Sequence, residues 1–571
     1  MIGLPAGLLL VGAGIGNVFT LDPIVARERL IGLLVASALA LMILVGLQRI
    51  GGSATLLIAV SSVALVGGLW VIAASGPDVF RGGVGTVLDR VFSPVFGLVH
   101  LTDSVDIDNT RFIVGYNGLA DLCLVAIFAC GGVLLERSRG APVWMATAGM
   151  AVAGVLLVGT GSRGGLTGLA AGVCAIGLYA WPRRYALLAA VGAPVAAALA
   201  AFGVLDKGLE FSSTAGRLTY WGDLTRLLVE YPLTGVGLGV DTANRVALQY
   251  EINPDPERIF YAHNTFVQTY LEQGPLGALG MLLVPGLAIA TALLARRFGV
   301  VPGRRGLLAL GLGVVAGLTA HGLTDQVVTT NVGTALLLAG LATGVAALAP
   351  RGHAALVTGL RWLSIGLAVA GVLLGVGIAA LPGLRGQALL DVGGLQVNQA
   401  LALDAQAPGR ATALANAEAT LTLALDQAPG QPAVLRNLAR VRAARYDDSG
   451  ALAALQAAAA SNRLDAFDTL QVAHLYRDFG FAEQGYEWAA RAYAAWGRPG
   501  EDAVMQVYAQ STLVDDYRAR TLAEQAEAAM RARTFSAAVS LFEQALSFQP
   551  DSFYLQDRLG AAQRAEQRYG G

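Results

Sequence analysis

A histidine followed by an asparagine stands where a polar segment meets an apolar run. His263 and Asn264 follow a polar stretch at about 205–260 and precede an apolar run that ends at Arg296 and Arg297. A titratable side chain at the mouth of a membrane helix is costly to place, so it is a candidate for function. A neutral imidazole can take a proton from an attacking hydroxyl group. We therefore predict that His263 is a general base rather than only a helix cap or loop anchor. Asn264 would orient the imidazole or the substrate, or cap the helix.

Two arginines earlier in the chain could hold an anionic group beside that base. Arg163 lies in the glycine-rich sequence Gly161–Gly165 between two apolar runs, and Arg217 lies in the polar stretch before an amphipathic segment. Arginine stays charged and presents a planar fork that fits phosphate oxygens. We predict that both arginines bind such a group. The alternatives are that Arg163 reaches lipid headgroups and that Arg217 forms a salt bridge within the loop.

A second histidine lies near the end of a later apolar run. His321 and Asp325 are four residues apart and therefore share one face of a helix. Asp325 could fix the tautomer of His321 or help to polarise an attacking hydroxyl group. The alternative is a buried ion pair that only locks the packing of helices.

Two further motifs offer other ways to bind phosphate or metal. Gly235, Gly237 and Gly239 could present backbone N–H groups to phosphate oxygens, or form a plain turn. Asp106 and Asp108 form an Asp-x-Asp pair that could hold a divalent cation. No further acidic cluster accompanies this pair, so we predict a site without a metal ion and without a cofactor.

The elements that position these residues are membrane helices. The 571 residues are 55% hydrophobic and only 14% charged, with a mean hydropathy of +0.57, whereas soluble proteins carry about 25% charged residues. The net charge of −1 argues against a nucleic-acid partner. The composition therefore predicts an all-α polytopic membrane protein.

The apolar runs occupy the first 381 residues, which we expect to form one transmembrane domain. Each run is long enough to cross roughly 30 Å of hydrocarbon. We expect about eleven spans, near 4–19, 30–47, 54–75, 114–135, 141–160, 164–181, 186–204, 265–295, 306–326, 329–348 and 359–381.

Positive charge between the spans predicts their orientation. The basic clusters are Arg137 with Arg139, Arg183 with Arg184, Arg296 and Arg297 with Arg304 and Arg305, and Arg351 with Arg361. All four fall on one side, which the positive-inside rule assigns to the cytoplasm; Arg27 and Arg29 do not fit. The long loops at about 76–113 and 205–262, together with residues 382–571, are then extracytoplasmic. Chemistry on that side has no ready access to cytosolic nucleotides, which favours a donor activated on a lipid.

Residues 382–571 have the composition of a soluble helical domain. Ala424, Ala458 and Ala492 recur at intervals of 34 residues, and Pro432 follows one of the predicted helix pairs. This pattern resembles tetratricopeptide repeats, with a non-repetitive helical domain as the alternative. A concave helical surface of this kind would bind a protein partner or orient a substrate.

Several of these motifs occur together in one known family. The first is His263-Asn264, which is followed after nine residues by Gly274-Pro275-Leu276-Gly277. The second is Gly216-Arg217 with Trp221, and the third is Pro232 with Gly235, Gly237 and Gly239. The others are Ser162-Arg163-Gly164 and the weaker match of Arg111 with Gly115–Ala120. In this order and topology they resemble the O-antigen ligase and polymerase superfamily of membrane glycan transferases.

The resemblance implies transfer of a glycan from undecaprenyl diphosphate to an acceptor at the outer face of a bacterial cytoplasmic membrane. It implies an inverting, metal-independent reaction. His263, Asn264, His321 and Asp325 would serve catalysis, and Arg217, Arg163, Arg258 and Arg111 would bind the diphosphate; Arg258 could equally be a solvated loop residue. The resemblance leaves the identity of the acceptor undecided. A ligase joins the glycan to a lipid, a polymerase joins it to another glycan, and a protein O-oligosaccharyltransferase joins it to a protein. A transporter of lipid-linked glycans and a membrane scaffold are the remaining alternatives.

Overall fold

The computed structural model describes two compact units of this chain. They comprise Met1–Val376 and Gly377–Gly571. The residues that the structure describes are 2–50, 58–60, 62, 66, 116–136, 140–159, 162–180, 182, 214–250, 261–324, 331–404, 407–495 and 519–569, the last with short gaps. Two predicted spans, 54–75 and 186–204, lie almost entirely outside this part of the chain.

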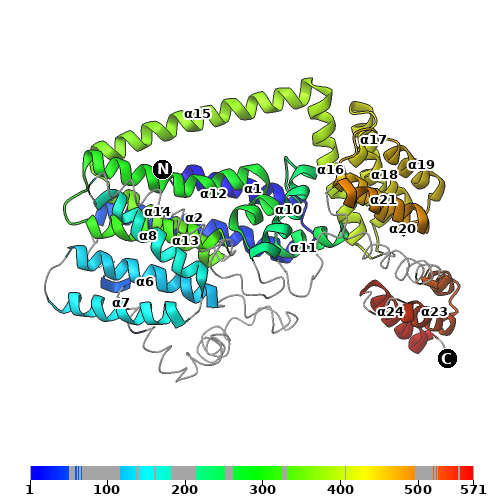
Figure 1. Ribbon diagram of the computed structural model, residues 1–571, viewed down its shortest axis with the longest axis horizontal. Coiled ribbons are helices and arrows are strands. Elements are labelled where there is room, and N and C mark those ends of the chain that lie inside the picture. Colours follow the sequence, from blue (N-terminus) through cyan, green and yellow to red (C-terminus); the bar gives the residue numbers. More distant parts are fainter. Residues whose placement is uncertain are drawn as a thin grey trace. The chain divides into compact units, whose positions relative to one another are not determined.

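The first unit is a bundle of apolar helices (Figure 1). Its long helices are α1 (Gly3–Val18), α2 (Pro23–Ile50), α6 (Tyr116–Glu136), α7 (Ala141–Gly159), α8 (Arg163–Ala180), α12 (Thr265–Phe298), α13 (Arg305–Gly322), α14 (Asn331–Ala346) and α15 (Pro350–Ala380). Within the described residues, α2, α6, α7, α12, α13 and α15 are each long and apolar enough to cross a membrane. The protein is therefore an all-α polytopic membrane protein, as its composition predicts.

Glycines allow α8 and α13 to pack backbone to backbone. A Cβ atom on Gly168 would lie 2.7 Å from the carbonyl oxygen of Gly317, and one on Gly172 would lie 2.8 Å from that of Gly313. Small residues at such intervals are typical of membrane helices that approach closely. This contact between glycines holds α8 against α13.

A second close contact joins α1 to a broken helix. Gly274 in α12 has φ +63° and precedes Pro275, so the helical path is interrupted there. A Cβ atom on Gly12 would lie 2.7 Å from the carbonyl oxygen of Gln273, and one on Gly280 would lie 2.9 Å from that of Pro5. The first helix is thus packed along both segments of α12.

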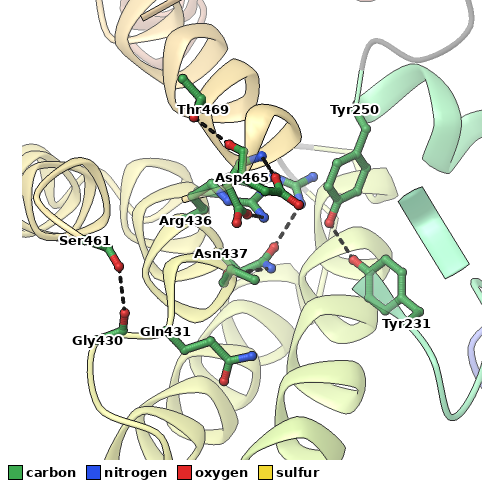
Figure 2. Close-up of polar contacts among 12 residues, drawn as sticks. Tyr231, Tyr250, Gly430, Gln431, Arg436, Asn437, Ser461, Asp465 and Thr469 are labelled. Carbon is green, nitrogen blue, oxygen red and sulfur yellow. Dashed lines mark hydrogen bonds and ion pairs between the residues drawn. The ribbon is translucent and has the colours of Figure 1, made fainter. Parts of the chain in front are cut away.

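The predicted polar loop at 205–262 contains two helices. They are α10 (Thr214–Glu230) and α11 (Val240–Gln249). The hydroxyl groups of Tyr231 and Tyr250, each directly after one of these helices, lie 2.7 Å apart (Figure 2). Residues 214–230 and 240–249 are therefore helical where the sequence predicts a loop.

Basic residues gather at one end of the bundle. Arg296 Nη1 donates to the carbonyl oxygen of Leu178 at 2.9 Å, and Arg304 Nη1 donates to that of Ala346 at 2.8 Å. Glu136 accepts from the backbone N–H of Gly306 at 2.6 Å, where a carboxylate favours the start of α13. These bonds join the ends of α6, α8, α12, α13 and α14 beside the arginines. Of the predicted clusters, 137–139 and 183–184 lie outside the described residues.

The second unit consists of helical hairpins. Its described helices are α16 (Pro382–Ala402), α17 (Arg410–Gln427), α18 (Pro432–Ala444), α19 (Asp448–Ala459), α20 (Ala466–Asp478), α21 (Ala482–Ala495), α23 (Phe535–Phe548) and α24 (Phe553–Tyr569). Ala424, Ala458 and Ala492 are fully buried near the ends of α17, α19 and α21. Ser461 donates to the carbonyl oxygen of Gly430, which ties the loop after α19 to the loop before α18 (Figure 2). The match to tetratricopeptide repeats stays a prediction.

Candidate active site

Several helix ends meet at the end of the bundle opposite the basic residues. The two ends of α13 lie about 27 Å apart at 1.5 Å per residue, so His321 is far from Arg305. Ser162 Oγ donates to Asn117 Oδ1 at the start of α6 at 2.7 Å. Asn264 Nδ2 donates to the carbonyl oxygen of Leu323, directly after α13, at 3.2 Å. These bonds bring the His263 turn, the start of α8 and the His321 end of α13 together.

The backbone of His263 adopts a conformation that is unusual for this residue type. Its φ is +48°, in the left-handed region that costs free energy for a residue with a Cβ atom. The side chain is half-buried, and its ring centroid lies 4.2 Å from that of Tyr261. Such strain persists only where the surroundings hold it, and it is concentrated at functional sites.

Asn264 is the N-cap of α12. Its Oδ1 accepts from the backbone N–H groups of Phe266 at 2.9 Å and Val267 at 3.2 Å. These contacts satisfy donors that have no partner within the helix, which is worth about 1 kcal/mol. Asn264 therefore fixes where α12 begins, one residue after the histidine.

His321 lies in a buried polar network. Its Nδ1 is 2.6 Å from Asp121 Oδ1 on α6, and its Nε2 is 3.3 Å from Ser162 Oγ. Ser162 also accepts from the backbone N–H of Gly165 at 3.0 Å and so caps α8. His321, Asp121 and Ser162 are each about 1% exposed. The network joins α6, α8 and α13 through side chains.

A glycine makes room for the imidazole of His321. A Cβ atom on Gly164 would lie 2.2 Å from His321 Cδ2 and 2.6 Å from Thr324 Oγ1. Only a residue without a side chain fits between the ring and the first turn of α8. The glycine after Arg163 therefore has a packing function that is independent of the arginine.

The two principal arginines occupy the first turns of helices. Arg163 is the first residue of α8 and is exposed at the site end. Arg217 lies near the start of α10, and Trp221, one turn later, donates from its indole N–H to the carbonyl oxygen of Ala262. The helix that carries Arg217 is thereby attached to the residue before His263.

The other predicted site residues lie outside the part of the chain that the structure describes. They are Asp325, Arg111, Arg258, Asp106 and Asp108. Their placement beside His263 or His321 stays a prediction.

The glycine-rich turn is used for packing. The N–H groups of Gly235, Val236 and Leu238 donate to the carbonyl oxygens of Tyr231, Leu271 and Gly16 respectively. Gly235 has φ +69°, and a Cβ atom there would lie 2.5 Å from the carbonyl oxygen of Leu271. The first bond closes the turn on itself, the second holds the turn against α12 near its break, and the third holds it against α1. Phosphate binding by this turn stays a prediction.

Sequence reasoning missed Asp121, the residue that contacts His321. Asp121 lies inside the apolar helix α6, and an ionisable residue inside a membrane helix is itself a signal of function. Its partner could not be read from the sequence, because α6 and α13 are distant in the chain.

The family comparison covers the centre of this site. Residues 148–282 match the family model described as O-antigen ligase. The matched segment contains α8, α10, α11, His263 and the first part of α12. No curated protein matches the chain. The match to residues 148–282, together with the polytopic helical bundle, supports the O-antigen ligase superfamily and a membrane function of glycan ligase or polymerase type.

Proposed function

We propose that this protein transfers a glycan from undecaprenyl diphosphate to an acceptor hydroxyl group at the outer face of a bacterial cytoplasmic membrane. The observation that carries the proposal is the placement of His263, half-buried and strained, at the same end of the bundle as Arg163. A base and a cation at the same end of a membrane bundle suit a donor with an anionic leaving group on a lipid.

The reaction is a single displacement at the anomeric carbon. The acceptor oxygen attacks that carbon, the bond from the carbon to the diphosphate oxygen breaks, and the configuration inverts. The acceptor proton passes to the imidazole of His263. Undecaprenyl diphosphate leaves with the electron pair of the broken bond.

Fixed positive charge stabilises the departing diphosphate. Arg163 and Arg217 supply it, with Arg258 and Arg111 as further ligands of the phosphate oxygens. Because arginine remains charged at all relevant pH values, it can replace a divalent cation in this role. We therefore expect transfer without added metal.

The charge distribution supports an extracytoplasmic site. Arg296, Arg304 and Arg305 stand at the end of the bundle opposite His263, and positive ends face the cytoplasm. The acceptor is a lipid carrier for a ligase, a lipid-linked repeat unit for a polymerase, or a protein for an O-oligosaccharyltransferase. The helical hairpins after residue 382 would recruit that acceptor or a protein partner.

Transfer by the purified full-length protein tests the proposal. A synthetic undecaprenyl-diphosphate glycan serves as donor, with and without EDTA, for wild type, His263→Ala and His353→Ala. His353 is the matched control, because it lies beside Gln48 at the basic end. We expect transfer that survives EDTA, is lost in His263→Ala and persists in His353→Ala. Product analysis then identifies the acceptor.

Other outcomes contradict the proposal in distinct ways. Loss of transfer in EDTA would move the chemistry to a metal site and to Asp106 and Asp108. Normal transfer by His263→Ala would remove this histidine as the base. Movement of the donor across vesicle membranes without any glycan product would favour a transporter.

A further inference from the structure

Two buried polar side chains and one nearly buried arginine form a chain of contacts close to the His263 turn. Glu272 and Gln268 lie one turn apart on α12, and each is 0% exposed. The side chain of Arg29 on α2 is 12% exposed. Burying a carboxylate in a membrane bundle is costly unless it is paired and hydrogen-bonded. Ionisable side chains at such a place are therefore candidates for a function.

These side chains form a continuous chain of contacts that ends at the backbone next to His263. Arg29 Nη2 lies 3.5 Å from Glu272 Oε2. Gln268 Nε2 donates to Glu272 Oε1 at 2.7 Å. Gln268 Oε1 accepts from the backbone N–H of Ala262 at 2.9 Å.

The Glu272 carboxylate determines how the side-chain amide of Gln268 is oriented. An ionised carboxylate can only accept hydrogen bonds, so the amide of Gln268 must turn its NH₂ group towards Glu272. The amide oxygen then points towards Ala262, where it can accept from the backbone N–H. Arg29 lies on the other side of this carboxylate and is the positive charge that pairs with it.

The backbone of Ala262 is held from both sides. Its N–H is bound by Gln268, and its carbonyl oxygen accepts from the indole N–H of Trp221. The next residue is His263, with φ +48°. Two fixed peptide groups before His263, and the Asn264 cap after it, hold the backbone from which the imidazole projects.

We propose that Arg29, Glu272 and Gln268 are positioning residues for His263. They act through the Ala262 peptide and hold the imidazole where it can reach the acceptor hydroxyl group. The inference rests on the proposed function of His263 and adds a second group of residues on which the reaction rate depends. A misplacement of about 1 Å at a catalytic group can cost on the order of 10²-fold in rate.

Steady-state kinetics of the full-length protein test this inference. The variants are Glu272→Gln, Arg29→Met, Arg29→Lys and the double variant Arg29→Met with Glu272→Gln. The double variant leaves no unpaired buried charge, so it keeps the fold where a single variant fails to. Exposed neighbours on α2 provide matched controls as Arg27→Met and Glu28→Gln. The donor is the synthetic undecaprenyl-diphosphate glycan, and His263→Gln is the reference for loss of the base.

We expect kcat to fall about 10- to 100-fold in Glu272→Gln, Arg29→Met and the double variant, with the KM for the donor changed less than about threefold. Arg29→Lys retains the charge and should recover most of the lost kcat. Kinetics within about twofold of the controls would overturn the inference, as would a kcat that falls only in proportion to the folded fraction. If His263→Gln is itself active, the proposed function fails; if it is inactive while these variants match the controls, only the positioning role fails.

Discussion

His321 Nδ1 lies 2.6 Å from Oδ1 of Asp121, a residue 200 positions earlier in the chain. The pair is buried and joins α13 to α6 at the end of the bundle where His263 stands. With Ser162 on the other ring nitrogen, it fixes the helix ends that frame the site. The burial of His321 favours a role in holding the helix ends together. Its predicted role in catalysis stays a prediction.

Removing one member of this pair should destabilise the protein more than replacing both. Asp121→Ala leaves His321 buried without its carboxylate, and breaking a buried pair costs about 3–5 kcal/mol. The double variant Asp121→Asn with His321→Gln keeps neutral hydrogen-bonding groups and should lose less. Thermal unfolding in detergent measures both, with Glu28→Gln as an exposed control. Equal unfolding temperatures for Asp121→Ala and the control would show that the contact contributes nothing to stability.

A methyl group at the start of α8 should disturb the site through His321. In Gly164→Ala the new Cβ atom would lie 2.2 Å from His321 Cδ2, so the ring or the helix must shift. Overpacking of this kind typically costs about 1–3 kcal/mol. Gly154→Ala on α7 is the matched control, because a Cβ atom there meets nothing within 4 Å. Unfolding temperature and transfer rate are the readouts, and indistinguishable values for the two variants would contradict this packing argument.

Loss of the exposed arginine at the start of α8 should weaken use of the donor. Arg163→Gln removes a charge proposed to bind the diphosphate, and hydrogen bonds to charged groups contribute about 1.5–3 kcal/mol. The expected decrease in kcat/KM for the donor is therefore about 10- to 150-fold, with a smaller loss in Arg163→Lys. Arg245→Gln, exposed on α11, should behave like wild type. An unchanged kcat/KM in Arg163→Gln would exclude it from diphosphate binding.

Single cysteines should label from opposite sides of the membrane. Gly303→Cys lies between α12 and α13 at the basic end, and Ala407→Cys lies between α16 and α17. In a background without Cys123, Cys130 and Cys174, an impermeant maleimide applied to intact spheroplasts should modify position 407 and leave 303 protected. Labelling of 303 alone would invert the proposed orientation.

The membrane class and several residues of the candidate site can be read from the amino-acid sequence alone. The apolar runs predicted helices at α1, α2, α6–α8 and α12–α15, because hydrophobicity along one segment is a local property. His263 and Arg163 were identified by their types and positions at the ends of such runs. The glycine motifs also pointed to a tight turn before α12.

Which residues are partners follows from the packing of the helices in three dimensions. Asp121 meets His321, and Arg29 meets Glu272, across separations that no local pattern encodes. Arg29 did not fit the predicted charge distribution, and its pairing with a buried carboxylate gives the reason why it stands at the site end. The strained residue His263 likewise lies between Ala262, which is bonded to Gln268 and Trp221, and the Asn264 cap of α12. Hydropathy fixes which segments become helices, whereas the faces they share depend on close packing between glycines that lie far apart in the chain.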